Sequence, residues 1–152
     1  MLQRRMPQGA VTVRPAAPAD ADFVFRVTEA CMRGYAEQTF GQWDEALVRA
    51  SFASATHRII RHEGHDIGCI ALIDEGDHTK LDKLYILPAC QSRGIGTKIL
   101  RDIMAEAAAA RKPLRLSVLA VNPARRFYER MGFVVTRSTA ERHFMEWRPT
   151  PT

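Results

Sequence analysis

The sequence predicts a single mixed α/β domain, and three observations support that prediction. Its 152 residues suit one domain with a sizeable core. Hydrophobic residues make up 46% of the chain and charged residues 26%, as in ordinary globular proteins. Strand-like and helix-like segments alternate along the chain, and no linker separates them. We expect residues 1–10 to form a disordered leader, residues 11–148 the domain and residues 149–152 a short tail.

The first third of the chain predicts one strand followed by two helices. Alternating residues in "VTVRPA" predict a strand from Val11 to about Arg14, which Pro15 ends. "PADADFVFRVTEACMRGY" predicts a helix because apolar residues recur at helical spacing, and Gly34 is its expected end. "WDEALVRASFA" predicts a second helix, whose side chains expected in the core are Trp43, Leu47, Ala50 and Phe52.

The middle of the chain predicts a hairpin, a further strand and a long helix. "HRIIRHEGHDIGCIALIDEG" predicts strand, turn and strand, with the connection "HEGH" at residues 62–65. "TKLDKLYILP" predicts another strand, which Pro88 ends. A long helix is expected from the glycine turn in "CQSRGIG" to about Ala110. Its apolar residues recur at helical spacing and form one stripe: Ile95, Ile99, Leu100, Ile103, Met104 and Ala107.

The last third predicts a buried strand, a short helix and two closing strands. "LRLSVLAV" is apolar enough for a central strand. In "NPARRFYERMG", Asn122 is a suitable helix cap, Pro123 suits the first helical position and Gly132 suits the residue just past the end. "FVVTRS" and "RHFMEW" complete the order β-α-α-β-β-β-α-β-α-β-β.

Composition narrows the classes of partner. The net charge of +5 favours anionic ligands, but the basic residues are scattered and lack the interleaved aromatic residues of nucleic-acid-binding motifs. We therefore do not expect a nucleic-acid partner. Cys31, Cys69 and Cys90 are odd in number and far apart, which predicts reduced thiols, with neither a disulfide framework nor a metal site.

The N-terminal segment and the hydropathy of the chain bear on its location. "MLQRRMPQGA" has no apolar run after its arginines, and no later segment is apolar enough to span a bilayer. We expect no signal peptide, no membrane partner and a cytoplasmic location.

The turn in "CQSRGIGTKIL" has the properties of an anion-binding site. Gly94 and Gly96 lack a Cβ, so the backbone can approach a ligand closely, and the following helix presents unpaired N–H groups. Positive side chains surround it, namely Arg93, Lys98 and Arg101. The dinucleotide pattern fails because Ile99 replaces the third glycine, and the P-loop ending is absent. Taken alone, the turn is equally well explained as a plain tight turn.

The context of this turn resembles a known family. "QSRGIG" follows "LYILP" and begins a long helix, and "VLAVNPARRFYERMGF" follows later. Together these segments resemble the GNAT superfamily of acyl-CoA N-acyltransferases, from about Val11 to Trp147, although the front half resembles it in architecture only. The resemblance implies one mixed, mostly antiparallel sheet flanked by helices, with "KLYILP" and "LRLSVLA" as splayed central strands.

The resemblance also implies acetyl-CoA as co-substrate. Backbone N–H groups of residues 91–97 would hold its pyrophosphate, the Ile86 N–H would stabilise the oxyanion and Tyr128 would be the general acid toward the CoA thiolate. For Tyr128 a core position beside Phe127 is the structural alternative, and for Asn122 the helix cap explains the residue locally. The implied cofactor-binding residues are Leu84, Tyr85, Ile86, Gln91, Ser92, Arg93, Gly94, Ile95, Gly96, Thr97, Lys98, Asn122 and Tyr128.

The general base is the point where the sequence departs from the family. Lys80 occupies the position at which many members carry a glutamate. Four other residues are candidates, and the sequence assigns the role to none of them: Asp82, Glu37, His57 and His78. Cys90 as a covalent acyl carrier is disfavoured, because no histidine is arranged to activate it.

The acceptor-binding region is expected in "MRGYAEQTFGQWDEA", residues 32–46. Tyr35, Glu37 and Trp43 are the candidate substrate-binding residues there, with Glu37 receiving an ammonium group. The alternative is a packed connection between helices in which Trp43 anchors the core.

Two functions follow from these patterns. The first is an N-acetyltransferase that moves the acetyl group of acetyl-CoA to a primary amine by direct attack in a ternary complex. The alternative, which Lys80 motivates, is a non-catalytic acyl-CoA-binding regulatory module. Family members are often dimers, so the two closing strands are candidates for a homodimer interface.

Overall fold

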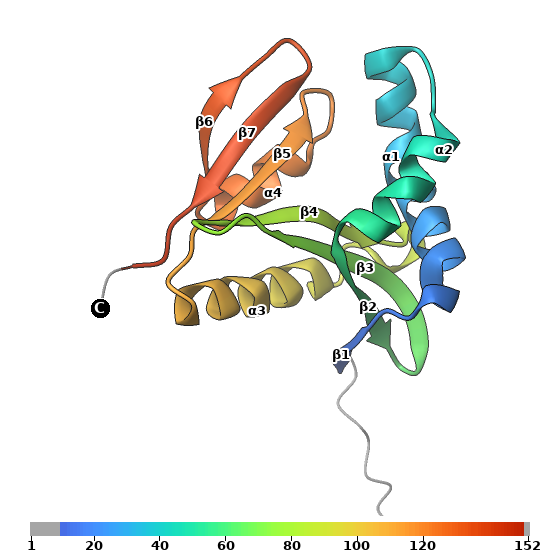
Figure 1. Cartoon of the computed structure of the whole chain (residues 1–152), viewed down its shortest axis with the longest axis horizontal. Helices are drawn as coiled ribbons and strands as arrows, with labels where there is room; N and C mark the ends of the chain where they lie inside the picture. Colours follow the sequence, from blue (N-terminus) through green and yellow to red (C-terminus); the bar gives the residue numbers. More distant parts are fainter. Residues whose placement is uncertain (1–9, 151–152) are drawn as a thin grey trace, which may run out of the picture.

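The computed structural model describes residues 10–150, so most of the predicted leader and the last two residues of the tail lie outside it. Within these residues the chain forms seven strands and four α-helices in the predicted order (Figure 1). Their bounds are β1 Val11–Pro15, α1 Ala21–Phe40, α2 Glu45–Ala50, β2 Thr56–His62, β3 His65–Asp74, β4 Thr79–Ile86, α3 Ile95–Ala109, β5 Leu114–Leu119, α4 Ala124–Arg130, β6 Val134–Ser138 and β7 Arg142–Trp147. Short 3₁₀ helices add η1 Pro18–Asp20, η2 Ser51–Ser54 and η3 Pro88–Cys90.

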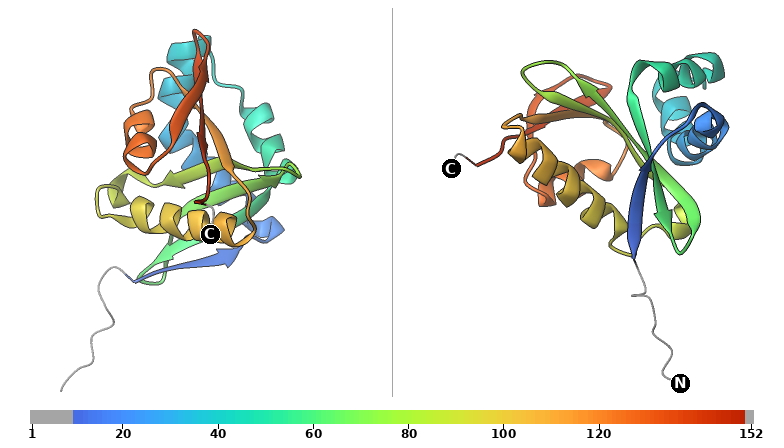
Figure 2. Two further views of the ribbon diagram at one scale, coloured as in Figure 1. Left: turned by 90° about the vertical axis from the view of Figure 1, so that its left-hand side faces the viewer. Right: turned by 60° about the horizontal axis from the view of Figure 1, so that its bottom comes forward.

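All seven strands form one sheet in the order β1-β2-β3-β4-β5-β7-β6. Every neighbouring pair is antiparallel except β4 and β5, which are parallel and enclose α3 as their crossover helix. Helices cover both faces: α3 lies on one face of β1–β4, and α1 and α2 lie on the other (Figure 2). The predicted fold class, a mixed and mostly antiparallel sheet flanked by helices, is confirmed.

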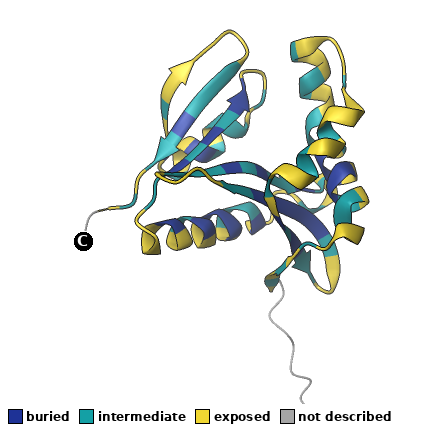
Figure 3. Ribbon diagram, viewed as in Figure 1, coloured by how far each residue is buried: buried dark blue, intermediate teal, exposed yellow. Residues whose placement is uncertain are grey.

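Two apolar clusters hold these layers together. The larger one joins α3, α4 and the sheet, and it contains the predicted stripe residues Ile95, Ile99, Leu100, Ile103 and Ala107. The smaller one joins α1 to the opposite face through Val24, Val27, Ile59 and Cys69. Figure 3 shows the buried positions concentrated along β2–β4 and along the side of α3 that faces the sheet. The central strands are therefore covered on both faces and fixed in place.

The hairpin turn was interpreted correctly, whereas two helix boundaries differ from the prediction. The "HEGH" turn has positive φ at Glu63 and Gly64, as a tight hairpin requires. Asn122 Oδ1 accepts the Ala124 N–H at 2.9 Å, but α4 begins at Ala124 with Pro123 as its N-cap, so Asn122 and Pro123 each lie one position before the predicted ones. Gly34 as the end of the first helix is wrong, because α1 continues to Phe40. The helix ends at Gly41 instead, whose left-handed φ of 76° and N–H bond to the Glu37 carbonyl terminate it.

The second predicted helix is shorter than expected, and two of its predicted core residues are wrong. Leu47 is 69% exposed and Ala50 is also exposed, since α2 spans only Glu45–Ala50 and η2 follows. Phe52 packs against the smaller cluster as predicted. Trp43 precedes the helix and lies beside Phe25, with ring centroids 6.3 Å apart.

The buried ammonium group of Lys83 joins η2 to the sheet, on the face of the sheet that α1 covers. Lys83 Nζ donates to Ser51 Oγ at 2.8 Å and lies 3.0 Å from His57 Nε2. His57 Nδ1 lies 3.2 Å from the Ala55 carbonyl, so a neutral imidazole protonated at Nδ1 satisfies every partner. Burial, and then the charge of Lys83, lower the pKa of His57. Burial also lowers the pKa of Lys83.

We predict that lowering the pH from about 7.5 to 5.5 reduces the free energy of unfolding. Because the folded pKa of His57 is depressed, the unfolded chain takes up a proton near its ordinary value of about 6.5 and the folded chain does not. Urea denaturation at the two pH values measures the change. The variant His57→Gln should show a smaller pH difference, and an identical difference in both proteins would contradict the assignment.

Candidate active site

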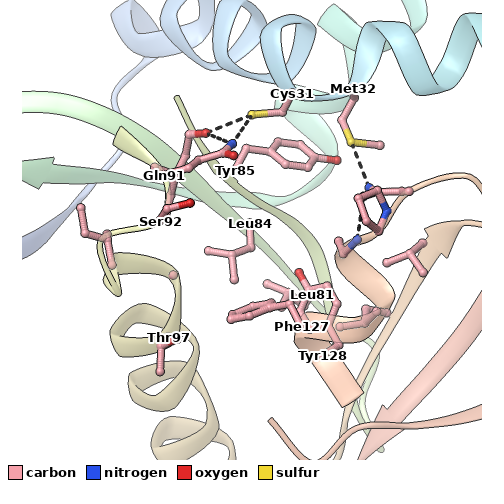
Figure 4. Close-up of a pocket in the computed structure, with 18 of the residues that line it drawn as sticks. Cys31, Met32, Leu81, Leu84, Tyr85, Gln91, Ser92, Thr97, Phe127 and Tyr128 are labelled. Carbon is pink, nitrogen blue, oxygen red and sulfur yellow. Dashed lines mark hydrogen bonds between the residues drawn. The ribbon is translucent and has the colours of Figure 1, made fainter. Parts of the chain in front are cut away.

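The site is a gap between the two parallel strands. β4 and β5 pair only at their first residues, Thr79 with Leu114 and Lys80 with Arg115, and then diverge. A cavity of about 630 Å³ occupies the divergence (Figure 4). Its walls come from both strands, the glycine turn, α1, α3 and α4: Cys31, Met32, Tyr35, Leu81, Asp82, Leu84, Tyr85, Ile86, Cys90, Gln91, Ser92, Gly94, Ile95, Gly96, Thr97, Leu116, Ser117, Val118, Asn122, Pro123, Ala124, Phe127, Tyr128 and Arg130. The sequence-predicted splay of "KLYILP" and "LRLSVLA" is therefore present.

The backbone at the end of β4 is directed into this gap. The Leu87 N–H donates to the Ile67 carbonyl at 2.8 Å, which points toward β3. Because backbone groups of successive strand residues point to alternate sides, the N–H and C=O of Ile86 point away from β3, toward the side from which β5 has diverged. The same alternation applies to Leu84. Two residues of β4 thus present backbone donors and acceptors to the cavity.

The glycine turn forms the cavity wall at the N-terminus of α3. Ser92 has a φ of 65° and Gly94 a φ of 77°, so this turn depends on left-handed backbone at both residues. A Cβ at Gly94 would meet nothing within 4 Å, so the conformation rather than space explains the glycine. The first N–H groups of a 15-residue helix lie here and favour an anion.

Two predicted basic contacts lie outside the cavity wall. Neither Arg93 nor Lys98 is among the residues that line it. Lys98 Nζ pairs with Asp102 of the same helix at 2.8 Å. At the glycine turn the cavity wall therefore offers backbone N–H donors. The positive charges of Arg93 and Lys98 lie near the wall but not in it.

Tyr128 is both a core residue and a cavity residue. It is 7% exposed, and its ring makes edge contacts with Phe127 at 5.2 Å and Phe133 at 5.5 Å. It also lines the cavity, so the two interpretations drawn from the sequence are compatible. Burial raises its pKa well above the ordinary value. The phenol therefore stays protonated and can act as a hydrogen-bond donor.

Among the predicted bases, the structure places only Asp82 on the cavity wall within residues 10–150. The register of β3 and β4 passes from Ala71↔Lys83 to Leu72↔Leu81, so Asp82 is an extra residue in a β-bulge. Bulges redirect side chains, which explains how Leu81 and Asp82 both reach the cavity. The Asp82 carboxylate lies 3.5 Å from Lys80 Nζ.

The other predicted bases have different environments. His57 is buried with Lys83 as described above. The His78 Nδ1 lies 2.7 Å from Asp77. Glu37 is exposed on α1 and pairs with Arg33 at 3.4 Å.

The predicted acceptor region is mostly helix rather than connection, because α1 extends through residue 40. Tyr35 lines the cavity, whereas Glu37 and Trp43 are not among the lining residues. Cys31 and Met32 also line it and were missed. They lie four and three residues before Tyr35, so helical spacing would have placed them on its face once the helix end was known.

Asn122 connects the two sides of the cavity. Its side-chain oxygen accepts the Ala124 N–H at the start of α4, and its Nδ2 lies 3.8 Å from Met32 Sδ. The residue therefore keeps the N-terminus of α4 close to α1. Phe127, Ser117 and Arg130 are further wall residues that the sequence did not single out.

All three cysteines are free thiols. In residues 10–150 no cluster of three or more metal-ligating side chains occurs. Within the same range, none of the helices is both long and apolar enough to cross a bilayer.

Comparisons with known proteins agree with the geometry. The family model of the acetyltransferase (GNAT) domain matches residues 53–135, which is more than half of the chain. Comparison with curated protein sequences gives no significant match.

Several solved structures are similar to the chain. The PaiA N-acetyltransferase from Thermoplasma acidophilum in complex with coenzyme A is 18% identical, with a TM-score of 0.72 and coverage of 91% of this chain and 99% of that one. The ribosomal-protein-S18-alanine N-acetyltransferase from Escherichia coli is 17% identical, with a TM-score of 0.73 and coverage of 94% and 96%. A GNAT family acetyltransferase from Elizabethkingia anophelis with acetyl-CoA bound is 14% identical, with a TM-score of 0.66 and coverage of 91% and 97%. At these identities the likeness shows a shared fold.

We predict that Gly68→Ala destabilises the strand that carries Ile86. A Cβ at Gly68 would lie 2.3 Å from the Tyr85 carbonyl oxygen and 3.2 Å from the Ile86 Cα, both backbone atoms. The strands must shift apart, at a cost of about 2 kcal/mol in the free energy of unfolding. Urea denaturation measures this cost.

Gly34→Ala is the matched control. Gly34 lies inside α1, and a Cβ there would meet nothing within 4 Å. That variant should be stabilised by up to about 1 kcal/mol, since alanine is the better helix former. Equal stability changes in the two variants would show that β3 and β4 do not require this close approach.

Proposed function

The chain belongs to the GNAT acetyltransferase family, whose members are acetyl-CoA-dependent N-acetyltransferases, and on that premise we propose direct transfer to a primary amine in a ternary complex. One observation carries the proposal. The gap between β4 and β5 joins the N-terminus of a long helix to unpaired strand backbone and to a buried phenol. These are the groups that a phosphate, a thioester carbonyl and a thiolate leaving group respectively require.

The residues present fit acetyl-CoA. The turn from Gln91 to Thr97 offers backbone donors to the pyrophosphate, and the β4 edge at Leu84 offers hydrogen bonds to a pantetheine amide in the manner of an added strand. The cavity of about 630 Å³ lies within the range of small-molecule sites. The bound co-substrate supplies the activated acetyl group, and acetyl transfer is its only chemistry here.

Ile86 and Tyr128 stabilise the two negative charges that develop during transfer, one on the carbonyl oxygen and one on the departing sulfur. The Ile86 N–H faces the cavity and is placed to donate to the carbonyl oxygen as it becomes negative. The Tyr128 hydroxyl is kept protonated by its burial, so it donates a hydrogen bond to the departing sulfur. With its pKa raised, full proton transfer to a thiolate is uphill, so we assign it hydrogen bonding rather than complete protonation.

Asp82 is the residue that we propose as base. An alkylammonium titrates near 10, so the acceptor must lose a proton before it attacks. Asp82 lines the cavity at the bulge, and its carboxylate lies 3.5 Å from Lys80 Nζ. Its carboxylate accepts the proton directly or through one water molecule.

Family membership supports the transferase over the alternative of a non-catalytic acyl-CoA-binding module. That alternative was motivated by Lys80 at the usual glutamate position, and Asp82 supplies a carboxylate two residues away. The proposed acceptor surface is the α1 side of the cavity, with Met32 and Tyr35.

We predict that Tyr128→Phe lowers kcat about a hundredfold and leaves the KM for acetyl-CoA nearly unchanged. Phenylalanine fills the same space beside Phe127 and Phe133, so only the hydroxyl is lost. Steady-state release of free thiol measures the effect, with thermal unfolding as the control for folding. Unchanged turnover would remove the role assigned to Tyr128.

We predict that Asp82→Asn lowers kcat more than tenfold at pH 7 and that the deficit shrinks toward pH 9.5. At high pH the amine is increasingly neutral without help, so the base matters less. The pH profile of kcat for both proteins tests this. Asp22→Asn, which changes an exposed carboxylate outside the cavity, should match the wild type throughout. A deficit that is constant with pH would argue against Asp82 as base.

A further inference from the structure

Three elements of the fold meet at a single backbone oxygen, the carbonyl of Ile86. Gln91 Nε2 donates to it at 2.8 Å, and Cys31 Sγ donates to it at 3.2 Å. The two donors also lie 4.0 Å from each other. Figure 4 shows both side chains converging on this oxygen, Cys31 from α1 and Gln91 from the turn before α3. We call this arrangement of Cys31, Gln91 and the Ile86 carbonyl the carbonyl clamp.

The clamp lies where the sheet itself provides no partner. The Ile86 C=O points to the side from which β5 has diverged, because pairing with β5 ends at Lys80. A backbone carbonyl at such a position requires a donor from elsewhere. An amide and a thiol side chain, 60 positions apart in the sequence, provide it.

The clamp determines the direction of the neighbouring N–H. Both polar groups of the peptide between Ile86 and Leu87 are hydrogen-bonded. The Ile86 carbonyl accepts from Gln91 and Cys31, and the Leu87 N–H donates to the Ile67 carbonyl of β3. The preceding peptide is held by the pairing of Tyr85 with Cys69. Ile86 therefore lies between two fixed peptide planes, and its own N–H cannot rotate away from the cavity.

Oxyanion stabilisation depends on this kind of rigidity. A donor contributes most when it is already oriented toward the place where charge develops, and small displacements are costly. The clamp is made by side chains outside the β4 backbone, so it can be weakened without changing the N–H itself.

We propose that Gln91 and Cys31 are positioning residues that orient the Ile86 N–H for catalysis, and that Gln91 links this N–H to the phosphate-binding turn. The inference rests on the proposed function. Gln91 immediately precedes Ser92, whose left-handed backbone starts the turn. A phosphate that orders the turn therefore also orders the Gln91 side chain, so binding at one end of the cavity prepares the donor at the other.

The state of the Cys31 thiol is consistent with this role. Burial is the largest influence on Cys31 and raises its pKa. The thiol stays protonated at neutral pH, so it acts as a donor to the carbonyl rather than as a nucleophile. A serine at this position would keep a donor, whereas an alanine would not.

Kinetics of clamp variants test the proposal. Gln91→Glu places a carboxylate against the Ile86 carbonyl and should lower kcat about tenfold, with the KM for acetyl-CoA changed less than about threefold. Gln91→Ala should have a smaller effect of the same kind. Cys31→Ala should also lower kcat, and Cys31→Ser should restore most of it. The control is Arg26→Ala on the exposed surface of α1, outside the cavity wall, which should match the wild type.

The double variant gives a sharper criterion. Because both donors act on one oxygen, the effect of Cys31→Ala combined with Gln91→Ala should differ from the product of the single effects. Unchanged kcat in Gln91→Glu, or a rise in KM at constant kcat, would overturn the positioning role and leave Gln91 as a binding residue only.

A measurement that is independent of turnover separates this inference from the proposed function. Amide hydrogen exchange at Ile86 and Leu87, followed by NMR, should be faster in Gln91→Ala than in the wild type and unchanged in Arg26→Ala. Equal exchange in all three proteins would overturn the clamp. Wild-type protein that binds acetyl-CoA but releases no thiol with any amine would refute the proposed function, and the exchange data would still decide whether the clamp holds the strand.

Discussion

The separation of β4 from β5 after two residue pairs is the constraint on which the site depends. A central strand normally forms backbone hydrogen bonds with both neighbouring strands. Beyond Lys80, β4 forms them with β3 alone, and its other backbone groups face the gap. The resulting donors and acceptors must be satisfied by something other than β5. Side chains satisfy one of them at the Ile86 carbonyl, and a strand-like ligand is proposed to satisfy the others.

The topology brings the remaining groups to the same place. Because α3 is the crossover between two parallel strands, its N-terminus lies just beyond the end of β4. Ligands of sheets with parallel strands commonly bind at that edge, where helix N-termini gather. The short helix α4 brings Tyr128 from the β5 side, and α1 closes the opposite side with Cys31 and Met32. At the glycine turn the site thus relies on oriented dipoles, since the nearby Lys98 is paired with Asp102 and does not line the cavity.

Features determined by local sequence were predictable, and features determined by register were not. The stripe on α3 depends on residues within a few positions of each other, and that prediction was confirmed. Asn122 does bond to the first N–H of α4, one position before the predicted cap. Gly34 was chosen as a helix end because glycine is common there, but a helix tolerates one glycine, and of Gly34 and Gly41 it is Gly41 that has left-handed backbone. The bulge at Asp82 depends on how β4 pairs with β3, so no pattern within β4 could reveal it. The contact between Cys31 and Ile86 joins residues 55 positions apart and was likewise invisible.

The most direct test of the account is calorimetric titration of the wild-type protein with acetyl-CoA, followed by addition of a panel of primary amines to the same sample and assay of free thiol. The account predicts saturable binding at one site per chain, and thiol release above background hydrolysis with at least one amine. The absence of any acetyl-CoA binding would contradict it, because the gap between β4 and β5 and the turn from Gln91 to Thr97 would then not be an acyl-CoA site.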